Sequence, residues 1–312
     1  MALVTCVGIM GADVVGKPID ALPEKGKLGL VDQIELHTGG CAANTGIALA
    51  ILGIDTAIIG KVGTDGFGDF ILQRYQKYGI DTTGVVRDPD IATSATMVFV
   101  HSDGERSFRH YFGTNATFCR NDIEIEPIKQ SKIVHVAGAF LMPALDGEPS
   151  AHIMREAQAA GVVTSLDTVW DARGLWLPQI APTLPYTDYF LPNYEEAQML
   201  AEGREDPDEI ARFLLDLGVK VVGIKRGAKG CYFRTQTGDH LSIPAHKVTL
   251  IDALGAGDSF VAGFLAGLAK EWDIEQCARF ACAVGACCVQ ALGATTGIRS
   301  FEETLQFMER QA

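Results

Sequence analysis

The sequence lacks the patterns that would assign it to several familiar classes of protein. Its 312 residues contain neither a Walker A sequence nor a GxGxxG run, so the common nucleotide fingerprints are missing. None of its eight cysteines forms a CxxC pair, which argues against a metal or redox site of the usual spacing. No apolar run approaches the roughly 20 residues needed to span a bilayer. With 26 basic against 39 acidic residues, the chain is also poorly suited to bind nucleic acid or anionic membranes broadly.

The amino-terminal segment and the cysteine-rich segment both have ordinary interpretations. The segment MALVTCVGIMGAD is apolar but has no basic region, so it predicts a first strand rather than a signal peptide. We therefore expect a cytoplasmic protein. In CARFACAVGACCVQAL, small apolar residues in a helical pattern surround Cys277, Cys282, Cys287 and Cys288. This pattern favours buried thiols in a packed helix over a metal or redox cluster.

Short β-branched segments and helical segments alternate along the whole chain. The segments VTCVGIM, TAIIGKV, KIVHVAG, VVTSLD, DYFLPN and KVVGIKRG have the character of buried strands. Between them lie the helical segments AANTGIALAIL, DFILQRYQKYG, SAHIMREAQAAG, DEIARFLLDLG and DSFVAGFLAGLAKEW, several of which end in glycine. Such alternation predicts an α/β protein with a parallel sheet and helices on both faces.

Two segments interrupt this alternation. Residues from about 14 to 38 contain glycine and proline followed by an alternating run, and residues from about 93 to 118 predict a hairpin that turns at Asp103-Gly104. Both segments adjoin glycine-rich stretches, so we expect a small β lid over a site rather than surface decoration. Because no internal repeat, low-complexity tract or linker is visible, we expect residues 1–312 to form one domain that carries this lid.

The stretch IDALGAGDSF places an aspartate directly behind three small residues and ahead of an apolar helix. Glycine costs roughly 1 kcal/mol relative to alanine in a regular element, so such a run indicates that a ligand approaches the backbone. Bare amides of Gly255, Ala256 and Gly257 at a helix start suit a phosphate or a developing negative charge. Asp258 would then accept a proton from an attacking hydroxyl; the alternative is a first-turn acid that complements the helix dipole.

Two further groups of polar residues suit hydroxyl-bearing ligands. The stretch TGGCAANTGIALAILG places Gly39 and Gly40 ahead of a helix with Asn44 in its first turn. The glycines let backbone amides approach a ligand, and the asparagine offers both a donor and an acceptor, unless it merely caps the helix. Asp13 lies just past the first strand and could accept two hydrogen bonds from a polyol, or it is a plain loop residue.

Two strand ends carry groups suited to phosphates and their metal ion. In LPNYEEAQML, Asn193 and Glu196 stand three residues apart where a strand enters a helix. This spacing suits Mg²⁺ held through water, because Mg²⁺ keeps several waters and needs few protein oxygens; the alternative is a helix cap with acids matched to the dipole. In GIKRGAKGCY, Lys225-Arg226-Gly227 puts positive charge at the carboxyl edge of the sheet, where ligands of open α/β sheets bind.

The motifs GGCAAN, LPNYEEA, KRGAKG and DALGAGDSF stand in the order and spacing found in the ribokinase-like (PfkB) carbohydrate kinases. The resemblance covers essentially the whole chain, and its last motif, D-x-x-G-A-G-D-x-F, is highly specific. It implies a ribokinase-like three-layer fold, with helices on both faces of a mostly parallel central sheet and a small β lid. It also implies transfer of the γ-phosphoryl group of ATP, with Mg²⁺, to a hydroxymethyl group of a small sugar.

The resemblance also implies roles for individual residues. Asp258 resembles the catalytic base, and the amides of the three preceding residues resemble the anion hole. The remaining candidates are Asp13, Gly39, Gly40, Asn44 and Asn115 for the sugar, Asn193, Lys225, Gly227 and Gly230 for ATP, and Asn193 with Glu196 for Mg²⁺. Some relatives bind a monovalent cation such as K⁺, and this role falls on Asp252 and the backbone near Leu254, Ala291 and Gly293. We also expect a homodimer formed through the lid.

The substrate is less well defined than the reaction. The stretch LDTVWDARGLW resembles the D-x-N-x-R-x-x-x-W pattern of fructokinases and 2-keto-3-deoxygluconate kinases, but Val169 stands where that asparagine would be. YFGTNATF resembles a stretch of ribokinases and fructokinases, whereas AFLMP replaces a carboxylate through which ribokinases contact ribose. Fructose, ribose and 2-keto-3-deoxygluconate are the leading candidates, and the acid would need Arg106, Arg109 or Arg173 for its carboxylate.

Two alternatives of other kinds remain. A nucleoside kinase would need an aromatic slot for the base, which Phe108, Tyr111 and Phe112 of the lid segment could supply. A catalytically silent sugar or nucleotide sensor would be expected to have lost the last aspartate of the GAGD motif, and Asp258 is present.

Overall fold

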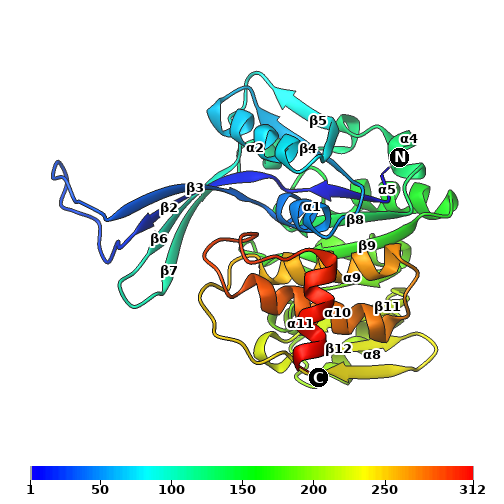
Figure 1. Cartoon of the computed structure of the whole chain (residues 1–312). Helices are drawn as coiled ribbons and strands as arrows, with labels where there is room; N and C mark the ends of the chain where they lie inside the picture. Colours follow the sequence, from blue (N-terminus) through cyan, green and yellow to red (C-terminus); the bar gives the residue numbers. More distant parts are fainter. Residues whose placement is uncertain (1, 312) are drawn as a thin grey trace.

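The computed structural model describes residues 2–311 and contains two sheets (Figure 1). The larger sheet has nine strands in the order β13-β12-β11-β10-β9-β8-β1-β4-β5. These strands are β1 (Val4–Gly8), β4 (Thr56–Gly63), β5 (Asp81–Asp88), β8 (Ile133–Ala139), β9 (Val163–Thr168), β10 (Tyr189–Phe190), β11 (Val221–Lys225), β12 (Cys231–Thr235) and β13 (His240–Ile243). All pairings from β5 across to β11 are parallel, as the alternation of segments predicts.

The edge formed by β12 and β13 is the antiparallel part of the mostly parallel sheet. Both strands pair antiparallel with their neighbours. The reason is the length of the connections: Arg226 to Gly230 joins β11 to β12, and four residues, 236–239, join β12 to β13. A parallel crossover needs a dozen or more residues, so these short turns can only reverse the chain.

Helices cover both faces of the large sheet. Their bounds are α1 (Cys41–Ile51), α2 (Gly66–Lys77), α3 (Thr114–Thr117), α4 (Ile125–Lys129), α5 (Glu148–Ala159), α6 (Trp176–Ile180), α7 (Tyr194–Leu200), α8 (Pro207–Asp216), α9 (Ala256–Ala269), α10 (Ile274–Cys288) and α11 (Phe301–Gln311), with short 3-10 turns η1 (Arg120–Asp122), η2 (Leu184–Tyr186) and η3 (Gly227–Lys229). Within residues 2–311, no helix is long and apolar enough to cross a bilayer.

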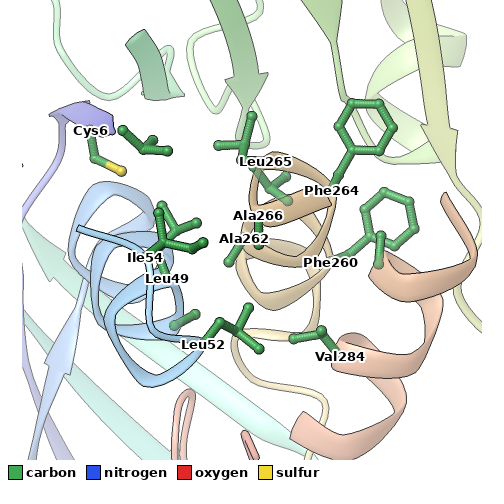
Figure 2. Close-up of a cluster of buried hydrophobic side chains, with 14 of the residues drawn as sticks. Cys6, Leu49, Leu52, Ile54, Phe260, Ala262, Phe264, Leu265, Ala266 and Val284 are labelled. Atoms are coloured by element: carbon green, nitrogen blue, oxygen red, sulfur yellow. The ribbon is translucent and has the colours of Figure 1, made fainter. Parts of the chain in front are cut away.

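Two large hydrophobic clusters, one on each face of the sheet, form most of the core, and a small third one lies between α10 and α11. The first joins the sheet to α1, α2, α9 and α10, and the second joins it to α5, α7 and α8. Figure 2 shows part of the first cluster, to which Leu49 of α1, Leu265 of α9 and Val284 of α10 all belong. Cys277, Cys282, Cys287 and Cys288 are buried thiols in α10, as the small-residue pattern predicts.

The smaller sheet is the lid and projects from one side of the body (Figure 1). Its strands are β2 (Gly11–Lys17), β3 (Gln33–Gly39), β6 (Ala95–Val100) and β7 (Arg106–Tyr111), in the order β3-β2-β6-β7. Two antiparallel pairs are joined by the parallel pairing of β2 with β6. The predicted hairpin is confirmed, and Gly104 in its turn has φ 90°. Residues 114–118, which we expected in the lid, return to the body, where Phe118 is buried in the second cluster.

The two faces of the lid differ in character. Residues directly opposite each other on paired strands point to the same face. One face carries the pairs Asp13–His37, Asp13–Thr96 and Val100–Arg106, and we call it the inner face because its residues contact the body. The opposite, outer face carries mainly apolar residues: Val14, Ile34, Leu36, Met97, Phe99 and Tyr111.

Candidate active site

The polar candidates gather where parallel strands of the large sheet end. Asp167 and Thr168 close β9, Asn193 follows β10, and Lys225 closes β11. A backbone bridge between Asn193 and Lys225 aligns two of these strand ends. The carboxyl edge of a parallel sheet is where open α/β proteins bind ligands, and the helices that begin there point their amino termini toward it.

Asp258 lies in the first turn of α9 and is held by α1. The Asn44 amide nitrogen Nδ2 donates a hydrogen bond of 2.8 Å to Asp258 Oδ2, and Thr45 Oγ1 donates to the Asp258 carbonyl at 3.4 Å. Removal from water raises the pKa of Asp258 to about 6, although the Asn44 hydrogen bond and the Lys225 charge lower it. The carboxylate is therefore ionised at neutral pH but basic enough to accept a proton.

The residues ahead of Asp258 leave the start of α9 open. Gly255 has φ 73°, and a Cβ there would overlap Ala294, so only glycine fits. A Cβ on Gly257 would instead lie 3.5 Å from Lys225 Nζ. The N–H groups of Gly255 and Gly257 have no acceptor within residues 2–311, whereas the N–H of Ala256 donates to Ala253 O at 3.3 Å. Two of the three predicted anion-hole amides are thus free, and Gly257 lies beside the Lys225 ammonium group.

Lys225 is nearly buried and paired with an aspartate that sequence reasoning missed. Its Nζ lies 2.8 and 2.7 Å from the two carboxylate oxygens of Asp167. Burial alone would lower the pKa of Lys225, but the carboxylates of Asp167, Glu196 and Asp258 outweigh burial and raise it. The signal available in the sequence was an aspartate at the end of the strand VVTSLD, at the same sheet edge as Lys225.

Asn193 and Glu196 form a cap at the start of α7, which is the alternative to Mg²⁺ binding that the sequence left open. Asn193 Oδ1 accepts from the Glu196 N–H at 2.8 Å, and Glu196 Oε2 accepts from the Asn193 N–H at 3.2 Å. The Thr168 hydroxyl also donates to Glu196 Oε2 at 2.9 Å. Burial and then the charge of Asp167 raise the pKa of Glu196 to about 7. The Lys225 charge lowers this pKa but does not outweigh burial and Asp167, so a bound divalent ion would further stabilise the charged carboxylate.

Asp13, Gly39, Gly40 and Asn115 lie together where the lid joins the body. The Asp13 carboxylate lies against Gly39, where a Cβ would overlap it, and burial raises its pKa while the Thr96 hydroxyl lowers it. Gly40 has φ 94° and approaches the carbonyl of Ile9. Asn115 is 2% exposed, and its Oδ1 accepts from the Met10 N–H at 3.2 Å.

Asn44 connects the residues around Asp258 with the predicted sugar-binding residues at the base of the lid. It lies in the first turn of α1, four residues after Gly40, and it contacts Asp258. Its Oδ1 is buried and has no hydrogen-bond partner within residues 2–311. An unsatisfied buried acceptor of this kind is costly, so it marks a place where a ligand donor would fit.

The remaining predicted residues lie in the turn after β11 and in the segment ahead of α9. Gly227 and Gly230 shape the η3 turn after β11; Gly230 has φ 83°, and its carbonyl accepts from the Arg226 N–H at 2.8 Å. Asp252 lies ahead of α9 and forms an ion pair of 2.5 Å with Arg106 of the lid.

Comparisons with known proteins identify the family of this chain. A sequence model described as pfkB family carbohydrate kinase matches residues 1–300. An uncharacterised sugar kinase of Archaeoglobus fulgidus is 32% identical, covering 81% of this chain and 98% of that protein. A ribokinase of Staphylococcus aureus is 31% identical (86% and 87% covered), and a 2-dehydro-3-deoxygluconokinase of Bacillus subtilis is 28% identical (92% and 91% covered).

Solved structures match the fold over its whole length. A fructokinase of Xylella fastidiosa with bound ATP has a TM-score of 0.84 at 26% identity, covering 100% of this chain and 99% of that one. A protein of E. coli described as a ribokinase II in complex with ATP and Mg²⁺ has a TM-score of 0.86 at 23% identity, covering 99% and 100%. The three-layer arrangement with a lid is therefore that of these structures.

Proposed function

Since the chain belongs to the pfkB family of carbohydrate kinases, which are ATP-dependent phosphotransferases, we propose that it transfers the γ-phosphoryl group of ATP to a primary hydroxyl of a small sugar, with Asp258 as general base. Residues 1–312 then act as one kinase domain, and the sheet β3-β2-β6-β7 is its lid.

One observation carries this proposal: a basic carboxylate, a cation and two bare amides converge at the start of α9. Phosphoryl transfer asks a protein mainly to position the reactants, to stabilise negative charge and to accept the hydroxyl proton. Gly255 and Gly257 supply N–H groups, Lys225 supplies positive charge, and Asp258 has a pKa near 6. Asn44 links the carboxylate to the residues that we assign to the sugar, Asp13, Gly39, Gly40 and Asn115.

The arrangement of arginines favours a neutral sugar over a sugar acid. Arg106 is paired with Asp252, and Arg173 lies between Asp146 at 3.5 Å and Asp171 at 4.0 Å. Arg109 lies opposite Met97, on the outer face of the lid. Each of the three arginines that could hold a substrate carboxylate is therefore engaged or turned away. We propose fructose or ribose as the class of substrate.

The test is a coupled kinase assay that measures kcat/KM for fructose, ribose, 2-keto-3-deoxygluconate, adenosine and inosine under one set of conditions. We expect a neutral sugar to be the best substrate. Phe108 is half exposed on the inner face of the lid and could receive a base. A nucleoside that exceeds every sugar by about tenfold would therefore overturn the sugar assignment, and turnover of none of the five would contradict the kinase proposal itself.

Mg²⁺ fits the same site through Glu196, with Asn193 beside it. Glu196 Oε2 already accepts two hydrogen bonds, so its role would be to hold waters of the ion rather than to bind the ion directly. When bound, the ion would neutralise negative charge on the ATP phosphates. ATP would lie near Lys225 and the turn of Gly227 and Gly230.

We expect Glu196→Gln to raise the Mg²⁺ concentration that gives half-maximal activity several-fold, because the variant loses a buried negative charge beside the ion. A titration of activity with MgCl₂ at saturating ATP measures this. Glu195→Gln is the matched control, since Glu195 is the adjacent, exposed acid of the same helical turn. Identical Mg²⁺ titrations of Glu196→Gln and the control would remove Glu196 from the assignment.

We propose that two chains associate through the outer face of the lid. Ile34 is 68% exposed and Met97 57% exposed, and contiguous apolar surface of this kind marks an interface. The double variant Ile34→Glu/Met97→Glu should elute at the mass of one chain in size-exclusion chromatography with light scattering, while the wild type elutes at the mass of two. Met199→Glu, on α7, is the control for an exposed methionine elsewhere. A wild-type protein with the mass of one chain would exclude this dimer.

A further inference from the structure

We propose that the Arg106 guanidinium is the resident cation of the segment ahead of α9, and that it makes catalysis independent of a monovalent metal ion. The inference rests on the proposed kinase function, because the segment in question carries the Gly255 and Gly257 amides. It replaces the expectation that Asp252 binds K⁺. Arg106 then acts as a positioning residue through Asp252 rather than on the substrate.

Both oxygens of the Asp252 carboxylate are already in contact with groups of this chain. Its Oδ1 lies 2.5 Å from a nitrogen of Arg106 and accepts from the Leu254 N–H at 2.7 Å. Its Oδ2 accepts from the Gly293 N–H at 2.7 Å. The Asp252 side chain is 1% exposed and that of Arg106 is 18% exposed. A buried carboxylate neutralised by a guanidinium has no net charge that would attract a second cation.

Backbone hydrogen bonds also join the segment that contains Asp252 to the end of α10. Ile251 N–H and Asp252 N–H both donate to the Val289 carbonyl, at 2.8 and 3.2 Å. Gly293 follows in the loop after α10, and the ring of His37 on the lid lies against it. Asp252 therefore joins the segment ahead of α9 to the loop that contains Gly293, and Arg106 neutralises the carboxylate that makes this junction.

Arg106 reaches Asp252 because of its place in the lid. It begins β7 and lies opposite Val100, on the inner face that also carries Asp13 and His37. The ion pair consequently connects the lid to residues only three positions ahead of Gly255. A monovalent ion could neutralise Asp252 without involving the lid, whereas Arg106 makes the position of the lid and the position of the amides depend on each other.

The experiment compares wild type, Arg106→Lys and Arg106→Ala with the best substrate of the panel, in KCl, NaCl and choline chloride at equal ionic strength. We expect wild-type kcat to be the same in all three salts. Arg106→Ala should lose about tenfold or more in kcat in choline chloride, because the amides lose their alignment. KCl or guanidinium chloride should restore part of the lost kcat of Arg106→Ala. The kcat of Arg106→Lys in choline chloride should lie between those of wild type and Arg106→Ala. Arg279→Ala, which removes the exposed pair with Glu275 on α10, controls for the loss of a surface arginine.

Thermal unfolding of the same proteins provides a readout that does not depend on turnover. The unfolding midpoint of Arg106→Ala should be higher in KCl than in choline chloride, and that of wild type should be the same in both salts. Strong K⁺ dependence of wild-type kcat, or Arg106→Ala activity equal to wild type in choline chloride, would overturn the inference. Absence of turnover with every acceptor would contradict the kinase proposal instead, and the unfolding comparison would still test the cation.

Discussion

Replacing Asp258 with asparagine is expected to lower kcat by about 10²-fold or more, the usual range for a positioned general base, while the fold is retained. Asparagine preserves the shape of the side chain at the start of α9 but cannot accept the hydroxyl proton. The amide of Asn44 would still face it, so the local packing is kept. Steady-state assays at saturating sugar and ATP measure the effect, and an unchanged thermal unfolding transition shows that the fold is intact.

The matched control is Glu275→Gln, since Glu275 is an exposed acid in the first turn of α10. It has the same relation to its helix dipole as Asp258 but no contact with the site, so its kcat should equal that of wild type. Near-wild-type turnover of Asp258→Asn would assign Asp258 to the alternative role of a dipole-matched acid.

The pH dependence of the wild type provides a second test of the same carboxylate. Because the base must be ionised, kcat should be constant above the pKa of Asp258, which is about 6, and should fall as pH decreases below it. The residual activity of Asp258→Asn should lack this acid limb. Glu196, with a pKa raised to about 7, ionises in the same region, so the profile of Glu196→Gln separates the two groups.

Local patterns in the sequence were sufficient for most of the fold. The alternation of β-branched and amphipathic segments predicted the parallel strands, and Asp103-Gly104 predicted the hairpin of the lid. The exact bounds of the lid and the antiparallel edge strands were not predicted. β12 and β13 are short segments that alternate weakly, and their direction depends on the two connecting turns rather than on their own residues.

The candidate site was predicted as separate motifs, but the contacts between motifs were not. Glycine and capping patterns are local, so Gly255–Asp258 and Asn193–Glu196 could be read from spacing alone. The pairs Lys225–Asp167, Asn44–Asp258 and Arg106–Asp252 join residues 58 to 214 positions apart. A single sequence does not indicate which charged residues far apart in the chain will form ion pairs. For this reason Asp252 was predicted to bind K⁺, whereas the structure pairs it with Arg106.

Replacing Lys225 with methionine is expected to be the most destabilising single change in the site. Methionine fills a similar volume, but it leaves the buried carboxylates of Asp167 and Glu196 without the cation between them. Removing one partner of a buried ion pair typically costs about 3–5 kcal/mol of the free energy of unfolding. Urea unfolding at neutral pH measures this cost. Lys220→Met is the matched control, because Lys220 is 61% exposed in its pair with Asp188 and should cost less than about 1 kcal/mol.

The double variant Lys225→Met/Asp167→Asn separates stability from function at this pair. Neutralising Asp167 removes the uncompensated charge, so the double variant should regain most of the free energy of unfolding lost in Lys225→Met. The loss in Lys225→Met should also shrink as pH falls, because protonation of the stranded Asp167 has the same effect, and burial already raises the pKa of this carboxyl. Activity should not return in the double variant, since no cation then lies beside Gly257 to stabilise the transferring phosphoryl group. A double variant no more stable than Lys225→Met would show that packing rather than charge determines the cost, and a double variant with restored kcat would exclude Lys225 from the reaction.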